Sequence, residues 1–577
     1  MRMLIRRAGL AVATIACVVP ATTATAASFH RLRDPFFHYA RPATYGTART
    51  DGARVPLRDG SYLVCTVTRP ARAGRPAAGR FPGLVIDYTP YPRFRQVVDR
   101  PTARFYASRG YVVVYCDPRG SGASPGFLDP FSVQERQDDY DLIEWLARQP
   151  YADGRIGQEG GSYGGHSALM AAVTQPPHLR AILVQSGFSN WYVDSFFLGG
   201  VESVAQRGWE QSMRNGDVGP VRLSPVFDTY RQHPLYDAFW RERSVRAHWD
   251  KLTVPTLALE GWKDRYKRAM VADFRARRHT SWLVLGSWEH YSTQAGSVAH
   301  PFPAGSLGKQ PDLAWWDHWL KRLPSAPLPR ERVTAMETPD RSGSGWHQYR
   351  DWPPPGARTL RLSLNADGTL ATAPGRSARQ RFRDDGHDRG CDPSMASPCD
   401  PHQAAYDRSR RRLTYTTATL RADVVLTGAA HAIVRAAFPS GDGNVVVRLS
   451  DVAPDGTVTQ LATGWRRAAL YRGYDHVETL VPGKVYAIPV DTYPVYYRVA
   501  KGHRLRLSVS SGDWPTVMPD ANDGTLVTVA AGRGGSFADI RLLAPPRSAI
   551  ARAQSASRSG RSSSSRIAAR NSAASAP

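Results

Sequence analysis

Residues 62–319 alternate apolar, strand-like runs with segments whose apolar residues recur at helical spacing. The runs 83–88 and 111–116 are apolar along almost their whole length, which is typical of strands buried on both faces of a parallel sheet. Between them and the later runs, apolar side chains within 135–148 follow a helical period. The alternation predicts a doubly wound α/β sheet.

Two changes of pattern divide the chain. Residues 188–249 are dense in aromatic and charged side chains and show no strand of their own, which indicates a largely helical cap inserted into the sheet domain. Strand-like runs resume at 256–259 and 282–285. From residue 324 onward, short alternating segments separated by Gly, Asp and Pro turns predict a β-sandwich or jelly roll. A length of 577 residues suits two or three domains.

The N-terminus carries the three regions of a secretory signal peptide. Three arginines within the first seven residues precede an apolar run over 10–19, and small residues follow. The run is too short to span a bilayer. We therefore expect export, cleavage near Ala26 or Ala27, and a secreted or cell-envelope protein. The general secretory route is favoured, and a twin-arginine address stays open.

Removal of the signal leaves four of the five cysteines, an even number in an oxidising compartment. Cys391 and Cys399 bracket a short turn-rich loop that suits a local disulfide. Cys65 and Cys116 lie in two strand-like runs, where small buried apolar residues are at least as good an interpretation. No Cys/His spacing indicates a metal site, and we expect neither metal nor organic cofactor.

The formal net charge is +25, but the basic residues are not arranged as in a nucleic-acid-binding protein. The basic residues are nearly all arginines, scattered along the chain without a stripe of interleaved aromatics. Residues 545–577 lack acidic side chains and are rich in Ser, Ala and Arg, which predicts a disordered tail that contacts acidic cell surfaces non-specifically. We expect no nucleic-acid partner and no stable membrane insertion, and the oligomeric state stays open.

The strongest local signal is the run Gly160-Gly161-Ser162-Tyr163-Gly164-Gly165, a G-x-S-x-G motif between a predicted strand and a predicted helix. Glycines are needed because so tight a turn leaves no room for side chains around the serine. The turn places the Ser162 hydroxyl at the carboxyl end of the sheet, beside a helix N-terminus that favours developing negative charge. Ser162 is therefore the candidate nucleophile.

A serine nucleophile needs a base near neutral pH, and that base needs an orienting acid. After a G-x-S-x-G turn the chain order is Ser, then Asp or Glu, then His, with the last two just after late strands. Asp264 follows the run 256–259, and His290 follows the run 282–285. Both residues fit this order as the remaining members of a catalytic triad.

Other residues compete for these roles. Glu260 and Glu289 lie in the same two loops, where either is a solvated charge or a substrate contact. His248 and His318 lie in cap or helical contexts, where a structural histidine is the better interpretation. The choice of Asp264 rests on its position after the strand.

Further motifs accompany the serine motif: Arg119-Gly120-Ser121-Gly122, Gly261-Trp262-Lys263-Asp264, Gly286-Ser287-Trp288-Glu289-His290 and Trp315-Trp316-Asp317-His318-Trp319. Together with the serine motif they resemble the cocaine-esterase and X-Pro dipeptidyl-peptidase group of serine hydrolases, over about residues 55–514. The resemblance implies an α/β-hydrolase core with an inserted helical cap, followed by a C-terminal all-β jelly-roll, galactose-binding-like domain. It also implies an oxyanion hole made by the backbone N–H of Tyr163 and the hydroxyl of Tyr91.

These observations set the predicted boundaries. They are a signal peptide at 1–27, a hydrolase core at 28–187 and 250–323, a cap at 188–249, a β-domain at 324–544 and a basic tail at 545–577. Lys263 stands where the family commonly has an aromatic residue, and the cap is short for the family. Both departures bear on the substrate, because the cap and this loop help to shape the acyl pocket.

The predicted function is hydrolysis of a small ester, amide or peptide through an acyl-enzyme. Candidate pocket residues are Phe188, Trp191, Tyr192 and Trp262, with Phe196 and Phe197 as further aromatics of the cap. A true X-Pro dipeptidyl aminopeptidase is the first alternative, because Glu202 or Glu210 could recognise a free α-amine. The second alternative is a non-catalytic cell-wall or carbohydrate-binding protein on a hydrolase scaffold.

Overall fold

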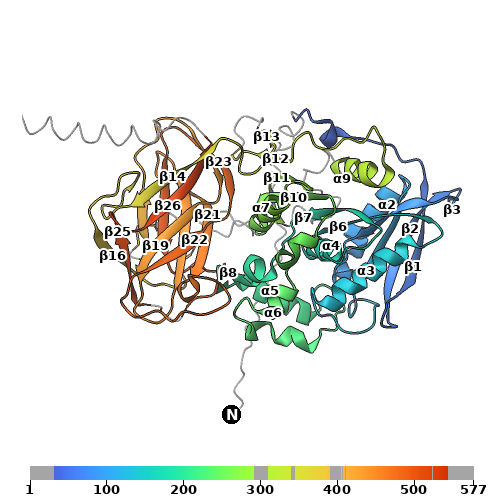
Figure 1. The fold of residues 1–577 in the computed structure, drawn as a ribbon, viewed down its shortest axis with the longest axis horizontal. Coiled ribbons are helices and arrows are strands. Elements are labelled where there is room, and N and C mark those ends of the chain that lie inside the picture. Colours follow the sequence, from blue (N-terminus) through green and yellow to red (C-terminus); the bar gives the residue numbers. More distant parts are fainter. Residues whose placement is uncertain are drawn as a thin grey trace, which may run out of the picture.

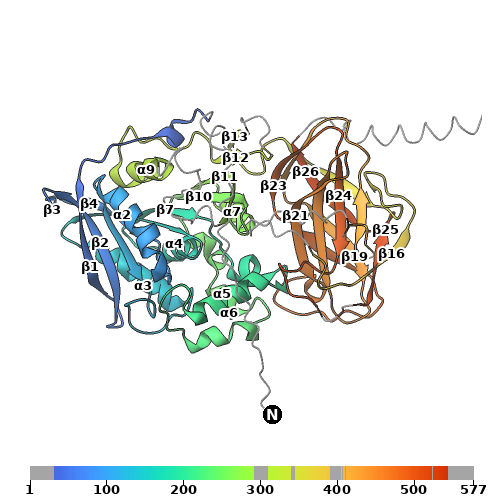
Figure 2. The same ribbon diagram turned by 180° about the vertical axis from the view of Figure 1, so that it is seen from behind.

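The computed structural model describes residues 32–290, 310–339, 345–389, 405, 407–409, 411–520, 522 and 524–543. In this part of the chain a mixed α/β domain and an all-β domain lie side by side, with helices α5 and α6 of the inserted cap on one side of the α/β domain (Figure 1; Figure 2 shows the reverse view). The predicted fold class is confirmed at this level.

The helical elements are η1 Pro35–His38, η2 Pro92–Phe94, η3 Arg95–Asp99, α2 Arg100–Ala107, α3 Val133–Ala147, α4 Tyr163–Val173, η4 Tyr192–Phe196, α5 Val204–Asn215, η5 Pro225–Asp228, η6 Tyr230–Gln232, α6 Ala238–Glu242, η7 Val245–Lys251, α7 Lys267–Ala276, α9 Gln310–Trp316, η8 Asp317–Lys321 and η9 Ala468–Leu470. The strands of the first domain are β1 Gly46–Pro56, β2 Tyr62–Arg72, β3 Arg75–Pro76, β4 Phe81–Ile86, β5 Val112–Asp117, β6 Ala152–Gly161, β7 Leu179–Gln185, β10 Thr256–Lys263, β11 Ser281–Glu289, β12 Val333–Met336 and β13 Trp346–Tyr349.

Among the described residues these strands form one eleven-stranded sheet in the order β1-β2-β5-β4-β6-β7-β10-β11-β12-β13, with β3 paired to β2. Neighbours from β5 to β12 pair in parallel, and the pairs at both ends are antiparallel. Val85 packs in the core with α3, α4 and α7, whereas Leu84 and Ile86 pack with α2 and α9. Side chains that alternate along β4 thus reach both faces, as expected for a strand covered by helices on each side.

The inserted segment between β7 and β10 contains short helices and one small hairpin, β8 Phe197–Leu198 and β9 Val201–Glu202. The sequence showed no strand there, because two-residue strands leave no alternating pattern. At the turn, Gly199 has a φ of 61° and lies against the Trp465 carbonyl, so a Cβ would clash with it. The Gly199 carbonyl accepts a hydrogen bond from the Arg467 N–H at 2.9 Å. The hairpin therefore joins the cap to the second domain.

The all-β domain has two sheets in the described part of the chain. Its strands are β14 Ala357–Leu364, β15 Leu370–Ala371, β16 Ala378–Arg383, β17 Leu413–Thr416, β18 Val424–Gly428, β19 His431–Ala437, β20 Asn444–Val452, β21 Val458–Arg467, β22 Tyr486–Asp491, β23 Val495–Val499, β24 Arg504–Ser510, β25 Leu526–Ala531 and β26 Phe537–Leu543. One sheet has the order β17-β24-β20-β21, and the other contains β15-β14-β26-β19-β25-β16 with β18, β22 and β23. The finer name of jelly roll stays a prediction.

The sheet boundary differs from the predicted domain boundary at 324. Strands β12 and β13 lie after that position, yet they extend the hydrolase sheet beyond β11. Their short alternating pattern resembles that of the β-domain strands. Only their pairing with β11 assigns β12 and β13 to the hydrolase sheet. The change of sheet therefore falls between β13 and β14.

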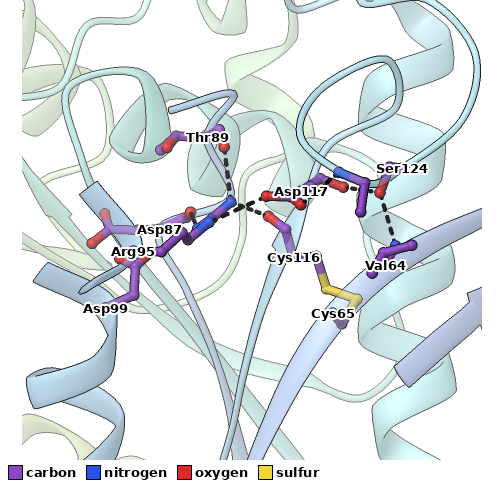
Figure 3. Close-up of a disulfide and its surroundings, with 10 residues drawn as sticks. Val64, Cys65, Asp87, Thr89, Arg95, Asp99, Cys116, Asp117 and Ser124 are labelled. Atoms are coloured by element: carbon purple, nitrogen blue, oxygen red, sulfur yellow. Dashed lines mark hydrogen bonds and ion pairs between the residues drawn. A yellow bond between two sulfur atoms is a disulfide. The ribbon is translucent and has the colours of Figure 1, made fainter. Parts of the chain in front are cut away.

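A disulfide joins Cys65 on β2 to Cys116 on β5, where the two residues face each other across the antiparallel pair (Figure 3). The Cys116 carbonyl also accepts a hydrogen bond from the Arg95 guanidinium. Arg95 donates further to the carbonyls of Thr89 at 3.0 Å and Asp87 at 3.1 Å. The disulfide thus lies beside the loop that follows β4. The predicted signal peptide, the Cys391–Cys399 disulfide and the basic tail lie outside the described residues.

Candidate active site

Ser162 lies at the tight turn between β6 and α4. Its backbone adopts a φ of 54° and a ψ of −113°, a strained conformation typical of a nucleophile turn. A Cβ on Gly160 would lie 2.5 Å from the Gly164 carbonyl carbon, and one on Gly164 would lie 2.9 Å from Thr89 Cγ2. The Gly161 N–H donates to Asp87 Oδ1 at 3.0 Å and ties the turn to the end of β4. Gly160 is therefore required by the close backbone of Gly164, and Gly164 by the close side chains of Thr89 and Asp87.

Ser162, His290 and Asp264 form a continuous hydrogen-bonded chain. Ser162 Oγ lies 3.0 Å from His290 Nε2, and His290 Nδ1 lies 2.7 Å from Asp264 Oδ2. An ionised carboxylate only accepts, so Nδ1 carries the proton and Nε2 accepts from the serine hydroxyl. The three side chains come from the ends of β6, β10 and β11, as the sequence predicted, and parallel neighbours bring those ends together.

Asp264 is fully buried yet stays charged. Burial alone would raise its pKa, but the electrostatic interaction and hydrogen bond with His290 and a donation from the Tyr266 N–H at 2.8 Å hold the pKa below its ordinary value. A carboxylate in this position keeps the imidazole in one tautomer and stabilises its protonated form.

Glu260, the competing acid, is fully buried and is not a solvated charge. Its Oε1 accepts from the Gly261 N–H at 2.7 Å. Burial and then the like charge of Asp264 raise the pKa of Glu260 well above its ordinary value, which favours its neutral form. Glu260 therefore contacts the backbone of its own strand end, while Asp264 contacts the histidine. The two competing histidines are elsewhere: His318 Nδ1 lies 2.9 Å from the Ala326 carbonyl, and His248 lies in η7.

The two predicted oxyanion-hole residues contact each other, and one of them, Tyr163, follows the serine directly in the chain. Tyr163 is the first residue of α4, where backbone N–H groups have no intrahelical acceptor. Its phenol donates to Glu135 Oε1 at 2.7 Å, which anchors the ring below the turn. The Tyr91 ring packs edge-on against the Tyr163 ring with centroids 5.7 Å apart. The Tyr91 hydroxyl accepts a hydrogen bond from Trp209 Nε1 at 2.8 Å.

The four predicted pocket aromatics are all buried. Trp191 packs edge-on against Phe131, Phe196, Trp209, Tyr230 and Trp240. Tyr192 stacks on Phe197 and donates to the Pro234 carbonyl, and Trp262 donates to the Met336 carbonyl at 2.7 Å and packs on Trp352. These three side chains therefore contribute to the cores of the cap and the domain boundary.

Phe188 is the predicted pocket residue with a path of contacts to the triad. Its ring contacts Tyr266 with centroids 4.7 Å apart, and Tyr266 packs edge-on against His290 at 5.3 Å. His166 also stacks on Phe188, and burial lowers the pKa of this histidine to about 4. A neutral His166 packs there as an aromatic residue.

The two cap carboxylates considered for amine recognition are held by arginines. Glu202 pairs with Arg207 at 2.6 Å and with Arg231 at 3.2 Å, and Glu210 pairs with Arg231 at 2.7 Å. Within the described residues, no cluster of three or more His, Cys, Asp or Glu suits a metal ion. The same part of the chain has no helix with the length and apolarity to cross a membrane.

Sequence reasoning missed three residues that hold the site in place. Trp209 contacts the Tyr91 hydroxyl from the cap, Arg95 binds the loop before Tyr91, and Glu135 anchors the Tyr163 ring. Trp209 and Arg95 belong to no recognisable motif. Only Glu135 carried a local signal, since Ser132 and Glu135 have the spacing of a helix capping box.

The mixed sheet, the serine turn and the Ser–His–Asp chain have the arrangement of an α/β-hydrolase. Models of two X-Pro dipeptidyl-peptidase domains match the chain: the S15-family domain over residues 59–222 and 211–292, and the C-terminal non-catalytic domain over 326–538. The chain therefore belongs to the cocaine-esterase and X-Pro dipeptidyl-peptidase family, and it is a serine hydrolase.

Relatives carry both activities in their names. The cocaine esterase of Rhodococcus sp. (strain MB1 Bresler) is 24% identical, over 82% of this chain and 92% of that protein. A Xaa-Pro dipeptidyl-peptidase of Lacticaseibacillus rhamnosus is 21% identical, over 71% of this chain and 59% of that protein. The solved structure of a CocE/NonD family hydrolase from Staphylococcus aureus has a TM-score of 0.71 at 19% identity, over 86% and 94% of the two chains, and shows the shared fold.

Proposed function

We propose that the protein hydrolyses ester or amide bonds through an acyl-enzyme on Ser162. The observation that carries the proposal is the hydrogen-bonded chain from Ser162 through His290 to Asp264, at 3.0 and 2.7 Å. His290 takes the hydroxyl proton through Nε2 as Ser162 Oγ attacks the substrate carbonyl carbon. Asp264 holds the Nδ1 proton and stabilises the imidazolium that forms.

The oxyanion of the tetrahedral intermediate is bound by the Tyr163 N–H and the Tyr91 hydroxyl. Each donor is worth about 3 kcal/mol by comparison with other oxyanion holes. His290 then gives its proton to the leaving alcohol or amine, and the acyl group stays on Ser162. A water molecule, deprotonated by His290, attacks the acyl carbon and releases the acid. None of these steps needs a cofactor.

For the substrate, we propose an ester or acyl compound without a free α-amine. A dipeptidyl-peptidase must bind the substrate ammonium, for which an unpaired carboxylate is the natural partner. Glu202 and Glu210 are already paired with Arg207 and Arg231, so an incoming ammonium would have to displace a guanidinium. The apolar rings of Phe188 and Tyr266, which lead to His290, suit an apolar acyl group better. The X-Pro dipeptidyl aminopeptidase remains the alternative.

The first test is labelling with a fluorophosphonate probe, which reacts with an activated serine. Labelling of the full chain and of a Ser108→Ala control, with loss in Ser162→Ala, would support the nucleophile. Ser108 donates to the Phe105 carbonyl on α2 and gives a matched serine outside the site. Absence of labelling in folded wild-type protein would refute the enzyme mechanism and favour the binding-protein alternative.

A second measurement separates the two substrate classes. Short acyl esters and Gly-Pro-anilide are compared by kcat/KM on the same preparation. We expect the esters to be preferred, and a preference for Gly-Pro-anilide that is lost on N-acetylation of the substrate would establish the peptidase instead.

We also propose that the protein is exported and that residues 1–27 are removed. The proposal is supported by the arginine-led apolar segment at the N-terminus and by the Cys65–Cys116 disulfide, which persists in oxidising compartments. Mass spectrometry of the protein recovered from culture medium tests it, with a mature N-terminus near residue 27 or 28 as the expected result.

A further inference from the structure

The Tyr91 hydroxyl is held by a side chain from the inserted cap. Trp209, on α5, donates its indole N–H to the Tyr91 oxygen at 2.8 Å. Tyr91 lies on the loop after β4, in the sheet domain, so the bond crosses from the cap to the nucleophile's neighbourhood. The two residues are 118 positions apart in sequence.

The chemistry of this pair fixes the direction of the phenol proton. An indole N–H only donates, whereas a phenol has one proton and oxygen lone pairs that accept. Tyr91 must therefore accept from Trp209, and its own proton points away from the indole. A hydroxyl that accepts one hydrogen bond also becomes a better donor of the next, because the two bonds polarise each other. Both effects suit a group that donates to a developing oxyanion.

The indole itself is held in place by its neighbours. Its ring packs edge-on against Trp191, with centroids 5.7 Å apart, and obliquely against Phe227 at 5.6 Å. The same part of the cap holds the Tyr91 loop by its backbone, since the Arg93 N–H donates to the Val218 carbonyl at 3.1 Å. On the other side, the Tyr91 ring packs edge-on against Tyr163. The phenol is thus fixed between the cap and the serine turn.

We propose that Trp209 is a positioning residue of the oxyanion hole, which makes the cap a part of the catalytic machinery. The inference rests on the proposed function of Tyr91 and Ser162. It implies that Trp209 acts on the reaction only through the Tyr91 hydroxyl.

The test is a double-mutant cycle on kcat for a short acyl ester with Trp209→Phe, Tyr91→Phe and both changes together. Phenylalanine keeps an aromatic ring against Trp191 and Phe227 but removes the N–H. We expect kcat to fall about 10-fold in Trp209→Phe, with KM changed less than about 2-fold, as for one lost hydrogen bond that acts in the transition state. In the double variant, kcat should equal that of Tyr91→Phe alone. Independent, multiplied losses would overturn the proposal.

Trp249→Phe is the matched control. Trp249 also donates its indole N–H to one partner, Asp273 Oδ1 at 3.0 Å, but it lies in η7 rather than beside Tyr91. Its kcat should stay within about 2-fold of wild type. Should Trp209→Phe fail to fold, Trp209→Met is the second variant, because the flexible thioether fills an irregular gap. An unchanged kcat in a folded Trp209 variant would overturn the proposal.

Two further readouts separate this inference from the function it rests on. An alkyl boronic acid forms a tetrahedral adduct with an active serine, and its affinity should fall about 10-fold in Trp209→Phe but not in Trp249→Phe. Unchanged affinity in Trp209→Phe would overturn the positioning role. Fluorophosphonate labelling of wild-type protein tests Ser162 alone. If wild-type protein is labelled but Tyr91→Phe does not change kcat, the Trp209 proposal is refuted, while Ser162 is still supported as the nucleophile.

Discussion

The Cys65–Cys116 disulfide should be a large contribution to the stability of the α/β domain. It closes a loop with a sequence separation of 51 residues. For a loop of that length, the chain-entropy relation gives a stabilisation of about 4 kcal/mol at 25 °C, because the cross-link restricts the unfolded chain. Both cysteines are buried between β2 and β5, so folding brings them together without exposing them to solvent.

The assay compares the free energy of unfolding of the oxidised protein with that of protein whose disulfide was reduced in the denatured state. The reductant is kept present in the second sample. The assay uses a Cys391→Ser/Cys399→Ser background, so that only one pair is under test. We expect reduction to lower the free energy of unfolding by about 4 kcal/mol, equivalent to roughly 10 °C in Tm for a domain of this size. Further replacement of Cys65 and Cys116 by Ala should lower the stability and abolish the response to reductant.

The result that would refute the reasoning is a stability that reduction changes by less than about 1 kcal/mol. An equal response to reductant in the variant that lacks Cys65 and Cys116 would also refute it. A second consequence concerns the site: Arg95 joins the Cys116 carbonyl to the loop of Tyr91, so the reduced protein should lose kcat before it loses its fold.

Three further predictions address the triad, a buried acid and the domain boundary. Asp264→Asn should lower kcat by about 10⁴-fold, because an amide can donate and thus stabilises the wrong imidazole tautomer. The control Asp250→Asn, at an exposed position, should keep the wild-type kcat. A loss below about 10-fold in Asp264→Asn would contradict the proposed role of Asp264 in the triad. Burial raises the pKa of Asp139 to about 8, so its contribution to stability is present at acid pH and is lost as the pH rises from about 4 to 8. Asp139→Asn should remove a slope of at most about 1.4 kcal/mol per pH unit from the pH dependence of unfolding, and an unchanged slope would show that Asp139 titrates normally. Trp262→Phe removes the hydrogen bond from the indole to the buried Met336 carbonyl, near the domain boundary, and should cost about 1–3 kcal/mol in thermal unfolding. An unchanged Tm would show that this hydrogen bond does not stabilise the protein.

The candidate nucleophile and its two hydrogen-bonded partners could be located from sequence because each occupies a fixed place relative to a strand. The serine motif set Ser162, and the ends of two late strands set Asp264 and His290. Tyr91 followed only from the family resemblance, since a tyrosine after an early strand has no local signature. The disulfide stayed undecided, because strands β2 and β5 become neighbours only through the sheet order.

The cap was the least predictable part of the chain. Aromatic side chains in such a segment pack equally well on each other or around a substrate, and sequence does not distinguish the two. Trp191 and Tyr192 pack on other cap residues, whereas Trp209 lies beside Tyr91 and carried no signal at all. The burial of Glu260 next to Asp264 was equally hidden, because a carboxylate in a loop is normally exposed.

The pairing of β12 and β13 with β11 has a consequence for any cleavage of the chain near residue 324. A protease that cut there would leave the catalytic fragment with β11 as an open edge, whose unpaired N–H and C=O groups can recruit strands from other molecules. The released fragment would carry β12 and β13 without a partner sheet. Two soluble fragments are therefore not the expected products, and the catalytic fragment should aggregate. The two domains cannot be separated at residue 324, although the sequence pattern places a domain boundary there.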